Sequence, residues 1–363
     1  MIGIYIHVPF CATKCPYCDF YSNRYSKTIA IEYGDAIVRN LRYYSKEYDV
    51  KADTLYFGGG TPSLMPVETL KQIVDTAKDT FGIDERSEVT LEANPRTLNT
   101  TKLEALRSMG INRLSIGVQS CVDSELKLLG RNNTFKDCKQ TVQNAIDCGF
   151  NNISCDLMIG IPNQTMDTLE YSLNTLASLD IQHISSYMLK IEEGTPYSND
   201  SIRSMLPVDD VVAEMYLKSV EVFKQYGYAQ YEVSNFAKSG YQSRHNNKYW
   251  QCVDYLGIGC ASHSCIGGKR FCVPCSTQEY ISCKVQPIEV TEERPYTFEE
   301  VGMLALRLST GLDMSKYPEY KSRVLSKAKP LERCGYLNIV QDTISLTAKG
   351  FLVSNAIIET LIL

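Results

Sequence analysis

The feature of this sequence that most constrains its fold is an alternation of strand and helix over positions 2–189. Short apolar and β-branched runs, typical of buried strands, occur at 2–8, 53–57, 88–92, 113–118, 152–157 and 183–189. Helical patterns separate them at 28–46, 66–81, 101–109, 135–148 and 166–179. Because βαβ crossovers are right-handed and leave few topologies, this alternation predicts an α/β fold with a parallel sheet curled into a partial (β/α)6 barrel.

Composition narrows the class of protein further. The chain has 363 residues, of which 44% are hydrophobic and 22% charged, as expected for a globular protein of two or three domains. The net charge of −5 provides no basic field, so we expect no nucleic-acid partner. Fourteen cysteines without an apolar signal segment indicate reduced thiols and a cytoplasmic location. The apolar stretch at 351–363 is too short for a bilayer, so no membrane span is expected.

Three cysteines, Cys11, Cys15 and Cys18, lie close together directly after the first predicted strand. Thiolates are soft ligands that suit zinc, copper or iron–sulfur clusters. A structural zinc site and an electron-carrying cluster both normally use four protein ligands, whereas three leave one iron of a [4Fe–4S] cluster open. The alternative is a redox-active or buried set of thiols without metal. The position after a strand favours the cluster.

Polar or glycine-rich residues follow the ends of the first five predicted strands. After the cysteines come the triplet 58–60, then Glu92, Gln119 and Asp156. Carboxyl ends of parallel strands meet at one rim, where such folds bind ligands. Individually, the triplet could form only a tight turn, and the other three could be solvated loop side chains. Together they predict a binding site at the barrel mouth.

The motifs at these positions resemble those of the radical SAM superfamily, and specifically the family of oxygen-independent coproporphyrinogen III dehydrogenase and the HemW-type heme chaperones. The similarity covers YIHVPFC, YCDF, GGGTP, EANP, GVQS, LGRN and DLMIGIP, which span positions 5–162. It implies a [4Fe–4S] cluster held by Cys11, Cys15 and Cys18, with S-adenosylmethionine bound at the open iron. The S-adenosylmethionine contacts that it implies are Tyr5, Tyr17, Gly59, Gly60, Thr61, Glu92, Gln119, Arg131 and Asp156.

A second motif lies in the region where the regular alternation has stopped. His245 and Asn246 are followed by Tyr249 and Trp250, the only tryptophan. In the chaperone branch His-Asn-x-x-Tyr-Trp is the heme-associated motif, so the resemblance implies that His245, Tyr249 and Trp250 contact heme. An imidazole and flat rings suit a planar macrocycle. The alternative is that His245 and Trp250 only pack the barrel against a second domain, with His263 as the next candidate ligand.

We expect three domains. Residues 1–200 form the radical SAM partial barrel, 201–294 a central α+β segment that contains a long helix at 208–226, and 295–363 a small helical, winged-helix-like domain with a hairpin at 336–344. We expect the last domain to act as a lid or docking domain, since its lysines and arginines fit a solvated helix face better than a DNA-binding face. Six cysteines at 252–283 leave open a second metal site, although buried reduced thiols fit their irregular spacing.

Two functions remain. The first is a heme chaperone that binds heme, uses its cluster and S-adenosylmethionine, and delivers heme to target (respiratory) apoproteins with a flavodoxin or ferredoxin as electron donor. The second is coproporphyrinogen III oxidase, a radical decarboxylase. The dehydrogenase branch has C-x3-C-x2-C-x-C and a longer amino-terminal segment, whereas this chain has Phe20 and reaches its first strand at Ile2. We therefore favour the chaperone and expect no coproporphyrinogen oxidase activity, while slow cleavage of S-adenosylmethionine is compatible with this function.

Overall fold

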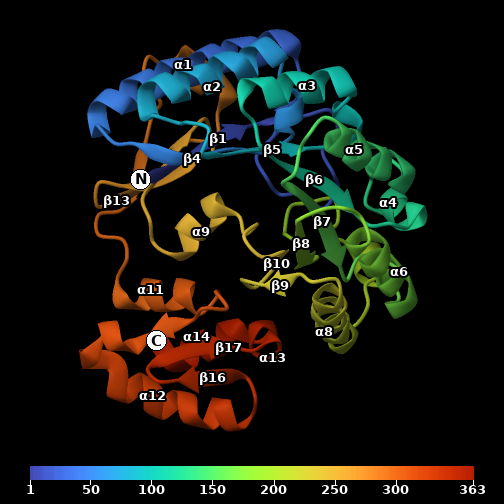
Figure 1. Cartoon of the computed structure of the whole chain (residues 1–363), viewed down its shortest axis with the longest axis vertical. Helices are drawn as coiled ribbons and strands as arrows, with labels where there is room; N and C mark the ends of the chain where they lie inside the picture. The colour runs from blue at the N-terminus through green and yellow to red at the C-terminus, as the bar shows by residue number, and fades with distance from the viewer.

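The computed structural model describes all 363 residues and is built on one twelve-stranded sheet (Figure 1). The six predicted strands lie side by side and pair in parallel, which confirms the partial-barrel prediction. They are β1 Ile2–Val8, β4 Ala52–Gly59, β5 Glu88–Ala93, β6 Arg113–Gln119, β7 Ile153–Ile159 and β8 His183–Met188. The second strand was expected to end at 57, before the glycine triplet, but Gly58 and Gly59 continue β4 and pair with His7 and Val8.

Helices cover the outside of these strands, close to the predicted positions. They are α1 Lys27–Tyr48, α2 Val67–Phe81, α3 Thr100–Met109, α5 Phe135–Asp147 and α6 Met166–Ala177. A short helix, α4 Asp123–Leu128, and the single-turn 3-10 helices η1 Pro62–Leu64 and η2 Pro95–Thr97 were not predicted, because they are too short for a hydrophobic period. Thr134 begins α5 with a capping box: its side chain accepts from the N–H of Asp137, whose carboxylate accepts in return.

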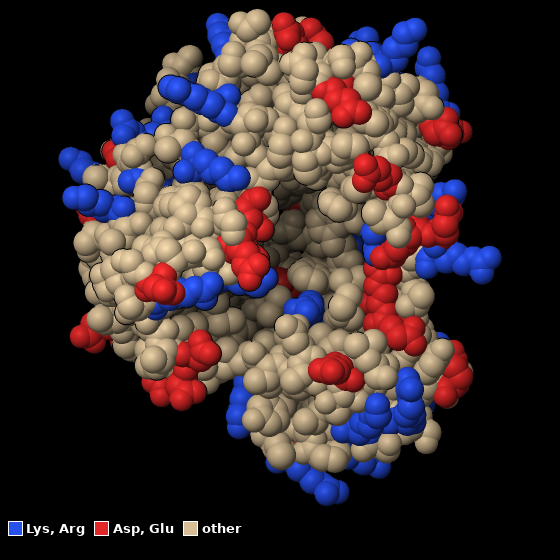
Figure 2. Space-filling model, turned by 180° about the vertical axis from the view of Figure 1, so that it is seen from behind, with Lys and Arg blue, Asp and Glu red and all other residues tan.

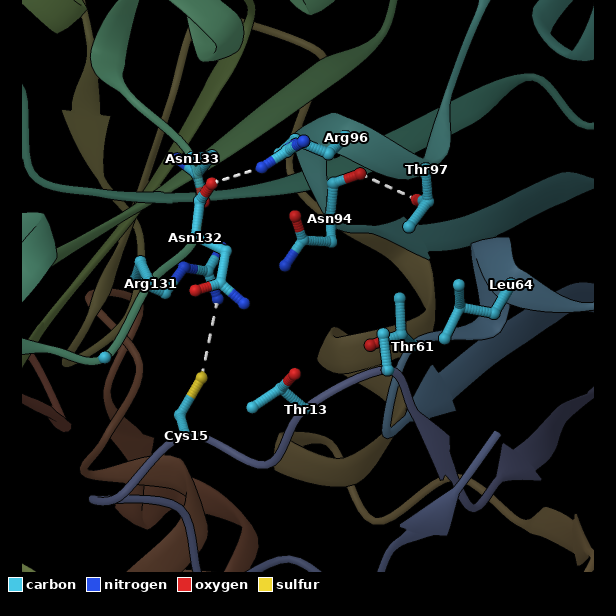
Figure 3. Close-up of a pocket in the computed structure, with 12 residues that line it drawn as sticks. Thr13, Cys15, Thr61, Leu64, Asn94, Arg96, Thr97, Arg131, Asn132 and Asn133 are labelled. Atoms are coloured by element: carbon cyan, nitrogen blue, oxygen red, sulfur yellow. Dashed lines mark hydrogen bonds between the residues drawn. The ribbon is translucent and has the colours of Figure 1, made fainter. Parts of the chain in front are cut away.

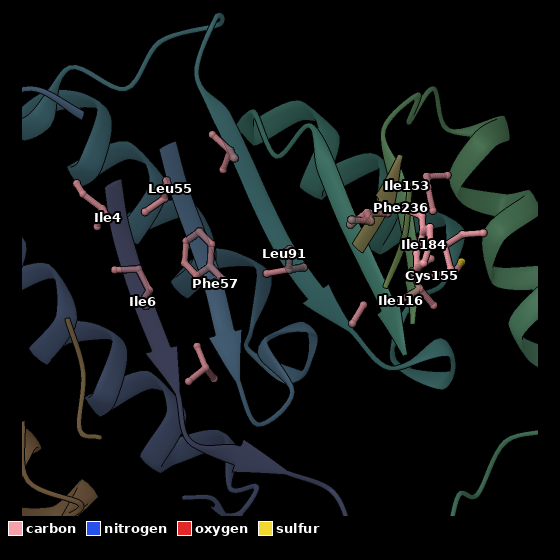
Figure 4. Close-up of a cluster of buried hydrophobic side chains, with 14 of the residues drawn as sticks. Ile4, Ile6, Leu55, Phe57, Leu91, Ile116, Ile153, Cys155, Ile184 and Phe236 are labelled. Carbon is pink, nitrogen blue, oxygen red and sulfur yellow. The ribbon is translucent and has the colours of Figure 1, made fainter. Parts of the chain in front are cut away.

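The sheet has an apolar face and a polar face. Residues that point outward, toward the helices, are fully buried; they include Ile4, Ile6, Leu55, Phe57, Leu91, Ile116, Ile153, Cys155 and Ile184 (Figure 4). Because side chains alternate along a strand, their neighbours point into the barrel lumen. Tyr5, Tyr56, Glu92 and Asp156 occupy such alternate positions. The helix-facing side of the sheet therefore supplies the core, and the lumen is left for polar chemistry.

The central segment extends the same sheet at both edges. After α7 Asp200–Arg203 and α8 Asp209–Gln225 come β9 Ala229–Gln230 and β10 Asn235–Ala237. Strand β10 pairs antiparallel with β8, and β9 pairs antiparallel with β10 at the sheet edge. After α9 Arg244–Trp250, strand β11 Tyr255–Ile258 pairs in parallel with β1. It is followed by β12 His263–Ile266, β13 Lys269–Cys272, α10 Thr277–Ser282 and β14 Glu289–Glu292. Hydrogen bonds thus join the predicted first and second domains, and a boundary near residue 200 stays a prediction.

The last part of the chain forms a small module below the barrel in Figure 1. Its elements are α11 Phe298–Ala305, β15 Leu312–Asp313, η3 Met314–Lys316, α12 Pro318–Arg333, β16 Leu337–Val340, β17 Thr343–Leu346, α13 Ala348–Leu352 and α14 Ser354–Ile362. The expected hairpin is β16–β17. The chain after the hairpin forms two helices, which are interrupted at Val353. Seen from behind, a hollow opens between barrel and module (Figure 2). No helix has the length and apolar character needed to cross a bilayer.

Candidate functional site

The cysteine loop begins where β1 ends, with Cys11 closing the short strand β2 Phe10–Cys11, which pairs with β3 Asn23–Arg24. Cys11, Cys15 and Cys18 are half-buried and form no disulfide. Hydrogen-bond donors approach two of the sulfurs: Thr61 Oγ1 lies 3.7 Å from Cys11 Sγ, and an Arg131 Nη lies 3.9 Å from Cys15 Sγ. The loop therefore presents three free thiols, and two of them have a hydrogen-bond donor nearby.

A cavity of about 290 Å³ lies beside this loop (Figure 3). Its lining is mostly polar and includes Thr13, Cys15, Thr61, Asn94, Arg96, Thr97, Arg131, Asn132 and Asn133. Arg96 donates to the carbonyl of Asn132, and this bond connects the two walls of the cavity. Three of the residues predicted from the sequence, Cys15, Thr61 and Arg131, thus lie around one space.

The donor set fits a cluster rather than a single ion. Nowhere in the structure are three histidine, cysteine, aspartate or glutamate side chains grouped as ligands of one metal ion. Each thiolate of a [4Fe–4S] cluster binds a different iron, so the three sulfurs need not converge on one point. The buried Nε–H of Arg131 also has no hydrogen-bond partner, which leaves a donor available to a bound group. The same finding gives no support to a second metal site among the six cysteines at 252–283.

The glycine triplet brings backbone close to Glu92. Gly59 has φ +110°, and a Cβ there would lie 2.7 Å from the ring of His7, so only glycine fits. Its N–H donates to Glu92 Oε2 at 3.2 Å, and the hydroxyl of Tyr56 donates to Oε1 at 2.8 Å. Burial raises the pKa of Glu92 to about 7, although these two hydrogen bonds oppose the shift. The carboxyl group therefore titrates near neutral pH.

The ends of β6 and β7 supply the opposite side of the mouth. Gln119 has φ +71°, in the left-handed region, and accepts a 3.0 Å hydrogen bond from the hydroxyl of Tyr187 at the end of β8. Ser115 donates to Asp156, whose pKa is raised to about 6 by burial. Arg131 donates to the carbonyl of Gly117, which lies two residues before Gln119 in β6. Sequence analysis missed Tyr187, although it ends a predicted strand as the other site residues do.

The remaining predicted contacts flank this mouth. The Tyr5 hydroxyl lies 3.1 Å from His7 Nδ1, and the Tyr5 ring stacks on Tyr56 at 6.1 Å. Tyr17 packs edge-on against Tyr197 at 6.0 Å. The carbonyl of Phe10 accepts from the N–H of Thr61, so the triplet is fastened to the cysteine loop. All nine residues predicted to contact S-adenosylmethionine thus belong to one end of the barrel, and their contacts stay predictions.

The histidine motif occupies the other end of the lumen. Ser243 caps α9. The carboxylate of Glu88 accepts the N–H groups of Arg244 and His245 at 3.0 and 2.9 Å. Lys248 forms an ion pair with Asp53 at 2.7 Å. Because Asp53 and Glu88 begin β4 and β5, helix α9 closes the amino-terminal end of the barrel, opposite the cysteines.

His245 is enclosed there. Its side chain is 1% exposed; Nδ1 lies 2.8 Å from Thr54 Oγ1, and Nε2 lies 2.8 Å from the hydroxyl of Tyr249. Burial, with Lys248 and Arg113 nearby, lowers the pKa of His245 to about 3, so the ring is neutral. Trp250 is half-buried. An iron atom could reach His245 only after one of these hydrogen bonds is released, and the predicted heme contacts stay predictions.

Comparison with known proteins identifies the family of this chain. The family model described as "Radical SAM superfamily" matches residues 5–176. The heme chaperone HemW of Bacillus subtilis is 35% identical over 98% of this chain and 98% of its own. The bovine "radical S-adenosyl methionine domain-containing protein 1, mitochondrial" is 37% identical over 72% of this chain and 60% of its own. The solved coproporphyrinogen III oxidase HemN of Escherichia coli superposes with a TM-score of 0.85 at 20% identity, over 99% of this chain and 90% of that chain, and so shares the fold.

The partial barrel, the three-thiol loop and the matching family model define a radical SAM protein. Membership of this superfamily implies a [4Fe–4S] cluster and S-adenosylmethionine as cofactors. Within the superfamily, similarity over nearly the full length places the chain in the HemW family.

Proposed function

We propose that this protein is a heme chaperone that binds heme, carries a [4Fe–4S] cluster with S-adenosylmethionine, and delivers heme to apoproteins. The observation that carries the proposal is the 35% identity to a heme chaperone over 98% of both chains. Respiratory apoproteins as acceptors, a flavodoxin or ferredoxin as electron donor and a cytoplasmic location are further parts of this proposal.

The residues that we propose to hold the cofactors are those that the family resemblance implies. Cys11, Cys15 and Cys18 would bind three irons, and the fourth would be left for S-adenosylmethionine. The Glu92 carboxylate, which the Gly59 N–H holds in place, would receive the ammonium group of S-adenosylmethionine, and the Arg131 guanidinium offers donors for its carboxylate. When bound and reduced, the cluster supplies the electron that cleaves S-adenosylmethionine.

Coproporphyrinogen III oxidase is the second candidate, since HemN has the same fold. At 20% sequence identity, this structural similarity shows only that the two proteins share a fold. The motif of that enzyme ends in a fourth cysteine, whereas this chain has Phe20, which is 62% exposed in the loop. The residues of the loop therefore favour the chaperone.

Both functions can be tested on one anaerobically reconstituted sample. We expect added heme to give a shifted Soret band at a stoichiometry of about one, and transfer of that heme to an apo-cytochrome. Reduced protein with S-adenosylmethionine should form no protoporphyrinogen IX from coproporphyrinogen III. Robust turnover to that product, or absence of heme binding, would refute the proposal.

A further inference from the structure

The four histidines of the chain differ sharply in their surroundings. His7, His183 and His245 are 6%, 0% and 1% exposed. His183 has Ser154 Oγ at 2.7 Å from Nδ1 and Tyr231 Oη at 2.9 Å from Nε2, so both nitrogens are engaged, as they are in His245. His7 contacts Tyr5 Oη and, at 3.4 Å, the carbonyl of Tyr21. His263 alone is exposed, and its ring forms no hydrogen bond.

A heme iron ligand needs an imidazole nitrogen with a free lone pair that a wide planar macrocycle can approach. The three buried rings fail this requirement because approach would displace strands or helix α9. The ring of His263 is exposed and forms no hydrogen bond, so its lone pair is free. We infer that His263 provides the axial ligand for heme iron at the mouth of the barrel. This inference rests on the proposed heme-chaperone function and deepens it by naming the ligand.

The position of His263 agrees with this role. It begins β12, which runs antiparallel to β11, and β11 runs parallel to β1. The residue therefore lies at the end of the sheet where β1 leads into the cysteine loop. A Cβ on Gly259 would lie 2.7 Å from the carbonyl oxygen of His7, so the turn before His263 packs directly on the end of β1. A heme held here would lie at the same end of the barrel as the cluster loop.

The surrounding segments connect His263 to that loop. Cys260, three residues earlier, lies 3.6 Å from Thr277 Oγ1, and this hydroxyl contacts the hydroxyl of Tyr21 at 3.3 Å. Phe20, next to Tyr21 in the chain, exposes its ring to solvent. Phe20 thus displays an apolar ring next to Tyr21, which is linked through Thr277 to Cys260, and the faces of a porphyrin are apolar.

Heme titration of the reconstituted full-length protein tests the inference. His263→Ala should fold normally, because an exposed side chain is removed, and should bind hemin on the order of 10–100-fold more weakly with a changed Soret band. Added imidazole should restore the wild-type band. Lys269→Ala, in the same hairpin and exposed, should titrate like the wild type.

The outcomes separate the two levels of the proposal. If wild type binds heme and His263→Ala binds with the same affinity and spectrum, the ligand assignment is wrong while the chaperone function stands. Loss of the band in Cys275→Ala, with His263→Ala unaltered, would transfer the ligand role to an exposed thiolate. If the wild type binds no heme, both proposals are wrong.

Discussion

Tyr56 and Glu92 are joined by a 2.8 Å hydrogen bond from the tyrosine hydroxyl to the carboxylate. The ring of Tyr56 also stacks on the ring of His245, with ring centroids 5.1 Å apart. One side chain in β4 therefore touches the predicted S-adenosylmethionine site and the predicted heme motif. A movement of His245 would therefore shift Tyr56, whose hydroxyl holds the Glu92 carboxylate.

Tyr56→Phe tests this link. The substitution keeps the ring but removes a hydrogen bond that stabilises the Glu92 carboxylate, so the pKa of Glu92 should rise further. We expect affinity for S-adenosylmethionine at pH 7.5 to fall by roughly 3–10-fold, the worth of about 1 kcal/mol. Titration calorimetry under anaerobic conditions measures this affinity. Tyr171→Phe, on an exposed tyrosine, is the matched control, and equal affinities of the two variants would contradict the role of Tyr56.

The raised pKa of Glu92 predicts a pH dependence for cofactor binding. Above its pKa of about 7 the group is a carboxylate that attracts an ammonium ion; below it, the neutral carboxyl does not. Affinity should therefore fall roughly tenfold between pH 7.5 and pH 6, a range in which an α-amino group with a pKa near 8 stays mostly protonated. The Glu92→Gln variant should bind S-adenosylmethionine weakly at both pH values. A wild-type affinity that does not change over this range would show that Glu92 does not bind the ammonium group.

Cys15→Ser tests the cluster. With two of three thiolates left, we expect loss of visible absorbance and of most iron and sulfide after reconstitution. Cys334→Ser removes an exposed cysteine of the C-terminal module and should leave iron and sulfide unchanged. A full complement of both elements in the Cys15 variant would exclude this cysteine as a ligand.

His245→Ala should destabilise the fold. The change leaves the hydroxyls of Thr54 and Tyr249 without their buried partner and opens space beneath Tyr56. We expect a loss of about 2–4 kcal/mol in free energy of unfolding, measured by urea denaturation. His263→Ala should remain within about 0.5 kcal/mol of wild type. If both variants unfold at the same urea concentration, His245 does not hold α9 in the barrel.

The sequence alone determined the barrel and its chemistry. Apolar runs such as 2–8 and the following helical patterns have periods that local sequence specifies, and right-handed crossovers then restrict the topology. The three thiols, Glu92, Gln119 and Asp156 could be assigned to one mouth because the ends of parallel strands meet. Resemblance to the HemW family named their cofactors, and comparison over the full chain confirmed the family.

Tertiary structure decided what surrounds these residues. Nothing local to His245 reveals that Glu88, from the start of β5, fastens α9 inside the barrel. The burial of His183 likewise depends on Tyr231 and strand β10. The exposure of His263 depends on strands β11 and β12 joining the sheet beside β1, a pairing between segments some 250 positions apart. Such long-range packing fixes which nitrogen atoms are free, because hydrogen-bond partners come from distant segments that periodicity does not place.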